Sequence, residues 1–242
     1  MLFRSGFGEI AAELGFRDGT RTSLLKNYSA FPVPDVYTET HRRVWSLTPR
    51  AKIPYEGLGH RHSLVLGIDA DDWDYDSSKA ASADAIGNPD SRVLATQRNA
   101  GIYLQHNSAI GERTKVTLGA RQQRVTTTAR DVVSPQAYAS GSKTSTPRAW
   151  EVGLRQKVAQ DTAAYVRVGS SFRIATIDEV YNQFGGPAFD PIVNLLEPQT
   201  SRDREVGLEY RVRDLRLRGS AFWSDLENEI YFFFPTFSNI NL

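Results

Sequence analysis

The residues with the most chemical potential in this chain are a run of aspartates near position 70. The run is Asp69-Ala70-Asp71-Asp72-Trp73-Asp74-Tyr75-Asp76. Carboxylate oxygens are the ligands that Ca²⁺ prefers, but this order lacks the glycine and the distal glutamate of an EF-hand loop. A solvated outer loop is the favoured interpretation, and contact with a cation or a cationic ligand is the alternative.

The four histidines offer little further chemistry. His60 and His62 are two positions apart and could point the same way as metal ligands, but no third ligand lies near them in the sequence. They are interpreted as polar residues of a turn, so we predict no metal site. His41 and His106 suggest nothing catalytic.

Nucleophilic chemistry has no motif behind it either. The chain has no cysteine, and its serines form no Gly-x-Ser-x-Gly elbow. Gly185-Gly186-Pro187 is a loop glycine pair and not a phosphate-binding turn, because no helix is predicted after it. We therefore predict no enzymatic activity, no catalytic residue and no cofactor. A hydrolytic membrane barrel is the alternative enzyme class, and it would need a Ser–His contact in its lumen.

The elements that must position these residues are strands with two different faces. Aliphatic residues alternate with Gly, Thr, Glu, Gln or Arg at residues 64–68, 100–104, 116–121, 150–155 and 206–211. Successive side chains of a strand point to opposite faces, so each segment has one face suited to hydrocarbon and one suited to water. Recurring segments of this kind predict a membrane β-barrel with lipid outside and a polar lumen.

Composition is compatible with such a barrel and excludes some alternatives. The 242 residues are 40% hydrophobic and 24% charged, without the long apolar run that a transmembrane helix requires. A transmembrane strand needs only about 10 residues, half of them apolar. The formal net charge of +1 gives no signal for nucleic-acid binding.

The connections between the predicted strands favour an up-and-down barrel. About nine strands are predicted, at residues 6–23, 37–52, 60–71, 96–106, 113–130, 148–158, 162–172, 203–213 and 215–232. Short turns at 53–59, 107–112, 159–161 and 213–214 alternate with long loops at 24–36, 73–95, 131–147 and 173–202. A soluble sandwich would mix its connection lengths. The predicted fold is all-β, an antiparallel up-and-down transmembrane β-barrel present as an open fragment.

The same pattern predicts which residues share a face. The concave, lumen-side face should carry the glycines of the repeated segments, namely Gly67, Gly101, Gly119, Gly153 and Gly207. The convex, lipid-side face should carry the neighbouring aliphatic residues, namely Leu66, Ile102, Leu118, Leu154 and Leu208. Two packed sheets would contradict this prediction.

Several phrases in the second half of the chain resemble one family. Ser171-Phe172-Arg173-Ile174-Ala175-Thr176-Ile177-Asp178-Glu179-Val180-Tyr181 resembles the Phe-Arg-x-Pro-x-x-x-Glu-Leu-Tyr phrase of TonB-dependent outer-membrane receptors. Asn194-Leu195-Leu196-Glu197-Pro198-Gln199-Thr200-Ser201 is similar to that family's Asn-x-x-Leu-x-Pro-Glu-x-Ser loop. Further similar segments are Glu205-Val206-Gly207-Leu208, residues 215–231 and Phe237-Ser238-Asn239-Ile240-Asn241. Ala175 and Gln199 depart from the family's usual proline and glutamate.

The resemblance has consequences for domain organisation. Barrels of this family close with about 22 strands around an N-terminal plug, whereas about nine strands are predicted here. Neither a plug nor a TonB-contacting box is recognisable in the sequence. Residues 1–242 are therefore expected to be part of one barrel domain, with the plug and the remaining strands absent.

The resemblance also implies a function and its partners. A receptor of this family would take up a scarce nutrient across the outer membrane of a Gram-negative cell, most often an iron–siderophore complex, and sometimes haem, cobalamin or a glycan. Its partners would be a TonB-type energy-coupling protein acting through the missing plug, the nutrient and outer-membrane lipid. The alternative is a plug-free porin or structural barrel without energised transport.

Ligand would arrive from outside, so its contacts are expected on the long loops. Concave binding sites combine aromatic walls with a few polar groups. The aromatic candidates on loops 73–95 and 173–202 are Trp73, Tyr75, Tyr181 and Phe184, and the nearby polar candidates are Asp72 and Asp74.

Overall fold

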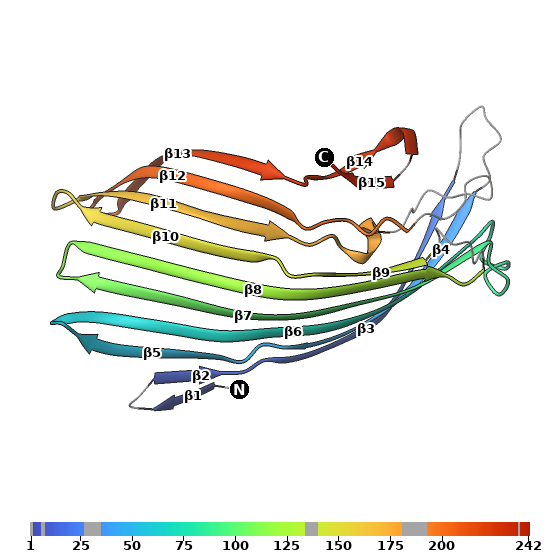
Figure 1. Cartoon of the computed structure of the whole chain (residues 1–242), viewed down its shortest axis with the longest axis horizontal. Helices are drawn as coiled ribbons and strands as arrows, with labels where there is room; N and C mark the ends of the chain where they lie inside the picture. The colour runs from blue at the N-terminus through green and yellow to red at the C-terminus, as the bar shows by residue number, and fades with distance from the viewer. Residues whose placement is uncertain (1, 6–7, 27–34, 134–139, 181–192, 237) are drawn as a thin grey trace.

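The computed structural model describes residues 2–5, 8–26, 35–133, 140–180, 193–236 and 238–242. These residues form one antiparallel sheet of 13 strands and a separate two-stranded hairpin (Figure 1). The strands of the main sheet are β1 (Leu2–Ser5), β2 (Gly8–Ala11), β3 (Leu14–Leu25), β4 (Val36–Leu47), β5 (Arg50–Gly57), β6 (His60–Ala80), β7 (Ser91–Ile110), β8 (Thr114–Asp131), β9 (Ser140–Ser145), β10 (Arg148–Lys157), β11 (Thr162–Arg173), β12 (Gln199–Val212) and β13 (Leu215–Glu227). Among the described residues, no helix is long and apolar enough to cross a membrane.

Strand neighbours in the sheet follow the chain. The main path runs β1-β2-β5-β6-β7-β8-β10-β11-β12-β13, with the β3–β4 hairpin extending from β6 and β9 paired to β8. Every pairing is antiparallel, and the path does not close on itself, so β1 and β13 are its two edges in the described sheet. The all-β meander is therefore confirmed as an open sheet.

Three of the predicted strands, 6–23, 37–52 and 215–232, are each divided into two strands in the structure. The predicted strand 6–23 is divided into β2 and β3, and 37–52 into β4 and β5, with Pro49 at the second break. Proline has no N–H to give to a ladder, so strands break or bulge where it occurs. Backbone hydrogen bonds still join the neighbouring strands at the breaks. The Thr48 N–H donates to the Glu13 carbonyl at 2.9 Å, and the Ile68 N–H donates to the Pro49 carbonyl at 3.0 Å.

The predicted loop 131–147 also differs from the structure, because it contains a strand. Part of it forms β9, which pairs with residues 125–130 in the second half of β8. Pro147 separates β9 from β10. The predicted strand 215–232 ends early, because Asn228 has a left-handed φ of 55° and directs the chain away from the sheet. Its last residues form β14 (Ile230–Phe233), which pairs with β15 (Ser238–Asn241).

The alternation of short and long connections is confirmed. At one end of the sheet, tight turns use left-handed residues, which are Leu58, Gly59, Gly111 and Arg213. At the other end the connections are longer and include a 3-10 helix, η2 (Ile177–Glu179). Figure 1 shows the tight turns on the left and the loops on the right. We call these the turn end and the loop end.

The largest difference from the predicted strand bounds concerns β6. The sequence predicted a strand at 60–71 followed by a loop at 73–95, whereas β6 continues to Ala80. The real connection to β7 covers only residues 81–90. Aspartate is unfavourable in strands, but here Asp72 and Asp76 face arginines of β7, 3.4 Å from Arg98 and 2.7 Å from Arg92. Cross-strand pairing of opposite charges allows the ladder to continue through the acidic run.

The predicted separation of the two faces is confirmed. The five aliphatic residues named for the lipid side are 39–63% exposed, whereas the five glycines named for the lumen side are buried or half-buried. We call these the outward face and the inner face. The inner face is the one that the loop end folds over, because Ile177 of η2 packs on Ala95 of β7 and Ala129 of β8. The main sheet thus has no second sheet packed against its aliphatic residues in the described chain.

A layer of loop segments is joined together at the loop end. Arg173 and Glu179 form an ion pair, and Glu179 also accepts a hydrogen bond from the Thr176 N–H at 2.9 Å. Asn194 donates to the Asn239 carbonyl at 2.6 Å, and Asn239 donates to the Glu179 carbonyl at 3.1 Å. The three loop phrases quoted for the family resemblance are therefore in mutual contact.

Candidate functional site on the inner wall

The predicted ligand residues near position 72 do not lie on a loop. Asp72, Trp73, Asp74 and Tyr75 are all within β6, so they alternate between its two faces. Asp72 and Asp74 share the outward face with Leu66, whereas Trp73 and Tyr75 share the inner face with Gly67. The predicted grouping of these aromatic and acidic side chains is therefore wrong. The other two predicted residues, Tyr181 and Phe184, lie outside the described residues.

Trp73 and Tyr75 are covered by the loop layer. Both pack against the cluster formed by Val93, Ala95, Ala129 and Ile177. They lie nearer the loop end than the aliphatic residues of β6, at the level where the outward face of β6 carries Asp72 and Asp74. Burial raises the pKa of Tyr75 to about 12, and the negative charge of Asp178 acts in the same direction. Tyr75 is thus a neutral hydroxyl at physiological pH.

A polar network lies below these two aromatic residues on the inner wall. Arg121 of β8 donates to Asp69 of β6 at 2.5 Å and to Gln123 at 2.9 Å. This bond passes diagonally over β7 at Gly101, which lies between Asp69 and Gln123 in the register. A Cβ atom added at position 101 would lie 3.4 Å from the Arg121 guanidinium, so the arginine passes in van der Waals range of Gly101.

A second set of hydrogen bonds lies nearer the loop end, around Asp71. Asp71 accepts a hydrogen bond from the Trp73 indole at 2.9 Å and another from the Asn99 amide. The amide oxygen of Asn99 is buried and has no hydrogen-bond partner among the described residues.

A repeated arrangement of tyrosine, glycine and arginine strengthens the lower wall. Tyr103 lies against Gly67 of the neighbouring strand, where an added Cβ would be only 2.2 Å from the ring. The Arg121 guanidinium lies 5.8 Å from the same ring centroid, close enough for a cation–π contact. Tyr165 repeats the pattern with Gly207 and Arg218, the latter at 4.7 Å.

Ion pairs connect the remaining inner-face charges across strands. The pairs are Arg155–Glu209 at 2.8 Å, Arg167–Glu151 at 3.0 Å and Arg218–Glu205 at 3.4 Å. All of these residues lie on the glycine face in the register. The inner wall is therefore polar and nearly charge-balanced, which suits contact with water, a polar domain or a polar ligand.

The histidines take no part in this wall. His62 and His106 lie on the outward face near the turn end, in a stack with Tyr55, with ring centroids 4.9 Å and 5.5 Å from His62. His41 pairs with Asp18 at 2.6 Å on the outward side of the β3–β4 hairpin. In the described parts of the chain, no group of three or more His, Asp or Glu side chains is arranged to hold a metal ion.

An antiparallel sheet with an aliphatic outward face, a polar inner wall, tight turns at one end and long loops at the other defines a transmembrane β-barrel of the outer-membrane type. The chain matches the family model described as TonB dependent receptor-like, beta-barrel, over residues 5–242. It belongs to this family of outer-membrane proteins.

Solved structures of similar fold carry the same barrel. The ferric citrate transporter FecA aligns with a TM-score of 0.76 and 15% identity, over 94% of this chain and 33% of its own. The copper transporter OprC gives 0.79 and 17%, over 98% and 39%. The ferric yersiniabactin uptake receptor FyuA from Yersinia pestis gives 0.69 and 13%, over 95% and 35%.

The identities are low, so the similarity concerns the fold, and the chain spans only about a third of the length of these structures. Among curated protein sequences, none matches this chain. The family and the outer-membrane location are established, whereas the transported ligand requires a separate argument.

Proposed function

We propose that this chain is part of a receptor that takes up a scarce nutrient across the outer membrane in a TonB-dependent way, with an iron–siderophore complex as the favoured cargo. Membership of the receptor family supports the transport class. FecA is a ferric citrate transporter, FyuA is a ferric yersiniabactin uptake receptor and OprC is a copper transporter, and the two ferric ligands favour an iron complex here.

The observation that carries the proposal is the inner wall of this family barrel. Asp69, Asp71, Asn99 and Arg121 form a hydrogen-bonded polar surface beneath the loop layer. A wide porin requires a water-filled path, whereas a fixed hydrogen-bonding surface suits repeated contact with a plug or a ligand. This supports a plugged receptor over the plug-free porin.

Ligand contact by the six predicted residues stays a proposal. We favour Trp73 and Tyr75, which lie on the inner face, together with Tyr181 and Phe184, which follow η2 in the sequence. Asp72 and Asp74 point outward from β6, so they would need to contact ligand from the rim.

The domain organisation belongs to the same proposal. The chain covers 33–39% of the three solved structures described above, which supports residues 1–242 as part of a larger barrel domain. A TonB-type energy-coupling protein would act through a plug, which would lie against the inner wall.

The experiment is uptake by cells that express the full-length receptor under iron limitation. We expect accumulation of radioactive iron supplied as a siderophore complex, and we expect it to stop when a protonophore removes the membrane energy. Uptake that persists after the protonophore and rises linearly with concentration would indicate a porin. A panel of ferric siderophores, haem, cobalamin and a copper salt identifies the cargo.

A further inference from the structure

The outward face has a charge pattern that nutrient uptake does not use. On four strands, the first charged residue met above the aliphatic band, going from the turn end to the loop end, is an arginine. These residues are Arg98 on β7, Arg124 on β8, Arg148 on β10 and Arg204 on β12. Arg121, Arg155 and Arg167 of the inner face are paired with carboxylates, so this outward series needs a different explanation.

The register places these arginines along a regular diagonal. Arg98 is level with Thr126 of β8, whereas Arg124 is one outward position lower and Arg148 one lower again, level with Gln122. Arg204 of β12 is paired with Val168 of β11, which is paired with Val152 of β10. Val152 is two outward-facing positions nearer the turn end than Arg148. Arg204 is therefore two positions lower than Arg148, two strands away. Strands of a membrane barrel are tilted, so residues at one depth occupy stepped positions in the register. The step therefore puts the arginines near a common depth.

Most of this series has no anionic partner in the protein. Arg98 lies 3.4 Å from Asp72. Within the described parts of the chain, no carboxylate lies within ion-pair distance of Arg124, Arg148 or Arg204, and all three are exposed. Diagonal neighbours on adjacent strands are about 7–8 Å apart, so Arg124 and Arg148 can act on one ligand.

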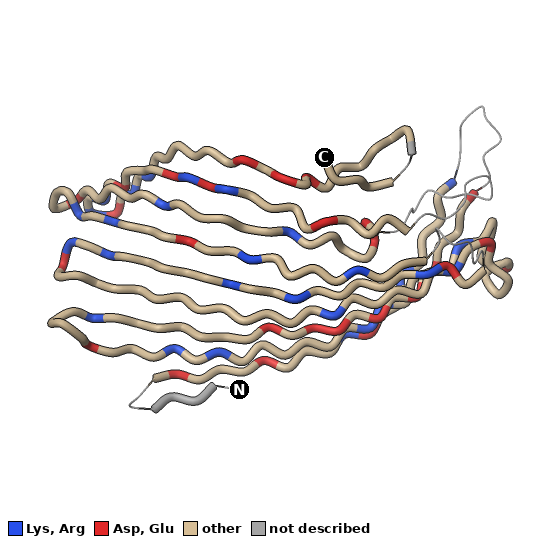
Figure 2. The backbone as a smooth tube through the Cα atoms, viewed as in Figure 1, with Lys and Arg blue, Asp and Glu red and all other residues tan. Residues whose placement is uncertain are grey.

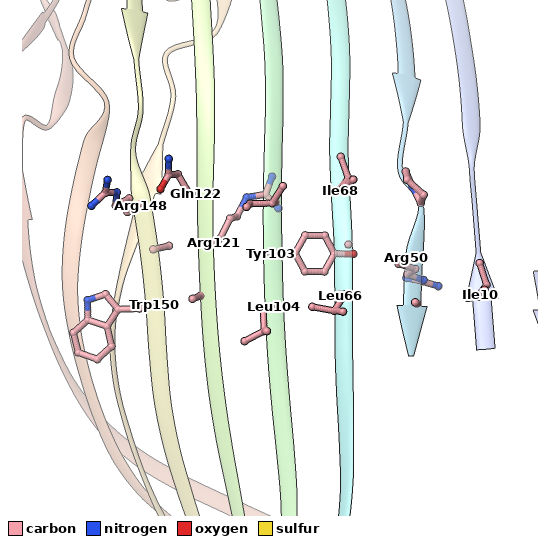
Figure 3. Close-up of a pocket in the computed structure, with 16 residues that line it drawn as sticks. Ile10, Arg50, Leu66, Ile68, Tyr103, Leu104, Arg121, Gln122, Arg148 and Trp150 are labelled. Atoms are coloured by element: carbon pink, nitrogen blue, oxygen red, sulfur yellow. The ribbon is translucent and has the colours of Figure 1, made fainter. Parts of the chain in front are cut away.

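A broad apolar hollow opens directly below Arg148 on the same face. Its volume is about 930 Å³, and its outward-facing lining includes Leu66, Ile68, Ile102, Leu104 and Trp150. Figure 3 shows Arg148 and Gln122 side by side toward the loop end, with Trp150 and Leu104 below them. Figure 2 shows that charged residues crowd the loop end of these strands and are sparse along much of their length toward the turns. Cations above a hydrocarbon-lined hollow match a molecule with an anionic head and apolar tails.

We propose that this surface binds one phosphate-bearing lipid of the outer leaflet. Its phosphate groups lie against Arg124 and Arg148, and its acyl chains lie in the hollow over β6, β7, β8 and β10. Arginine donates two parallel hydrogen bonds to a phosphate and stays charged at all physiological pH values. A glycolipid of the lipid A type, with two phosphates, fits two unpaired guanidinium groups.

The test uses the full-length receptor purified in detergent and stripped of lipid. Binding of diphosphoryl lipid A is measured by native mass spectrometry, with chemically dephosphorylated lipid A as the matched probe. We expect the variant R124Q/R148Q to bind diphosphoryl lipid A about 30-fold more weakly, which follows from about 1 kcal/mol for each basic residue at an anionic surface. R124K/R148K should retain most of the affinity, because it keeps both charges.

Two further variants separate the parts of the proposal. A120W fills the hollow between Leu104 and Trp150, so it should weaken binding while both arginines remain. R130Q removes an exposed arginine from the same face of β8, above the series, and should bind like the wild type. Unheated gel mobility checks that each barrel is folded. Equal binding by R124Q/R148Q and the wild type, or equal binding of the two lipid A forms, would overturn the proposal.

Discussion

At the scale of single residues, the inner wall depends on glycines that make room for the side chains of neighbouring strands. Gly67 and Gly207 each lie beneath a tyrosine ring, and an added Cβ would be 2.2 Å and 2.5 Å from the nearest ring atom. Each ring is in turn approached by an arginine that also binds a carboxylate, Asp69 or Glu205. Removing one glycine therefore disturbs an aromatic ring and an ion pair together.

The first prediction concerns Gly67. In the full-length receptor, Gly67→Ala should lower the free energy of unfolding by about 1–3 kcal/mol, because the new methyl group displaces the Tyr103 ring. Denaturant unfolding in lipid vesicles measures the change. Gly219→Ala is the matched control, because nothing described lies within 4 Å of its Cβ position. An equal effect of both substitutions would mean that loss of glycine itself, and not the ring contact, is responsible.

The second prediction concerns ligand contact. Tyr75→Phe keeps the ring of a residue packed beneath η2 and removes its hydroxyl, and Tyr181→Ala removes one of the predicted ligand-contacting aromatic side chains. Each should weaken binding of the ferric siderophore about tenfold, as equilibrium dialysis of the full-length receptor would measure. His60→Ala changes a residue at the turn end and should leave affinity unaltered. Loss of affinity in His60→Ala alone would mean that ligand enters from the turn end.

At the scale of elements, the loop layer and the β14–β15 hairpin form one connected unit. Asn241 accepts a hydrogen bond from the Glu197 N–H at 2.7 Å and donates to the carbonyls of Glu197 and Asn228 at 3.1 Å and 2.8 Å. A second contact joins Lys143 of β9 to Glu197 at 2.5 Å. Residues 194–201, which resemble a family loop, are thus bonded to β9 of the main sheet and to β15 of the hairpin.

The third prediction follows from these bonds. Asn241→Ala removes three hydrogen bonds and should raise amide hydrogen exchange in residues 193–198 by about tenfold, since each net bond contributes about 1 kcal/mol and some are exposed. Exchange in the middle of β7 should not change. Asn88→Ala is the control, because Asn88 lies in the connection between β6 and β7 and its bond to the Ala85 carbonyl comes from the backbone N–H, which the substitution keeps. Unchanged exchange at 193–198 would show that the bonds to Asn241 do not hold the loop.

At the scale of the whole molecule, the described sheet has two unpaired edges and an exposed aliphatic face. The edges are β1 and β13, and the outward face of β13 carries Leu215, Leu217 and Trp223, which are 51–58% exposed. Unpaired backbone groups are costly in hydrocarbon and invite pairing between chains in water. A sheet of this kind depends on further strands or another chain.

The fourth prediction is that residues 1–242 expressed alone aggregate without detergent and do not transport. Sedimentation and unheated gel mobility would measure this, with the full-length receptor refolded in the same detergent as the control. A monodisperse monomer in water with a cooperative melting transition would contradict the prediction.

Much of the fold was accessible from the sequence because it depends on local periodicity. Alternation of aliphatic residues with glycine and polar residues identified the two faces, and the lengths of the connections identified the turn end and the loop end. The acidic run after Asp69 was misplaced because aspartate usually favours loops, and its partners Arg92 and Arg98 are 16 and 26 positions further along the chain. No local pattern could show that pairing.

The candidate site was decided by tertiary structure, because its contacts join residues far apart in the chain. Asp69 and Arg121 lie on the two strands that flank β7, and their bond crosses β7 at Gly101. The register of β6, β7 and β8 also separated Asp72 from Trp73 and set the outward arginines in a stepped series. Alternation within one strand is a property of the sequence, whereas the side chains that meet across three strands depend on register, which is fixed only when the sheet is formed.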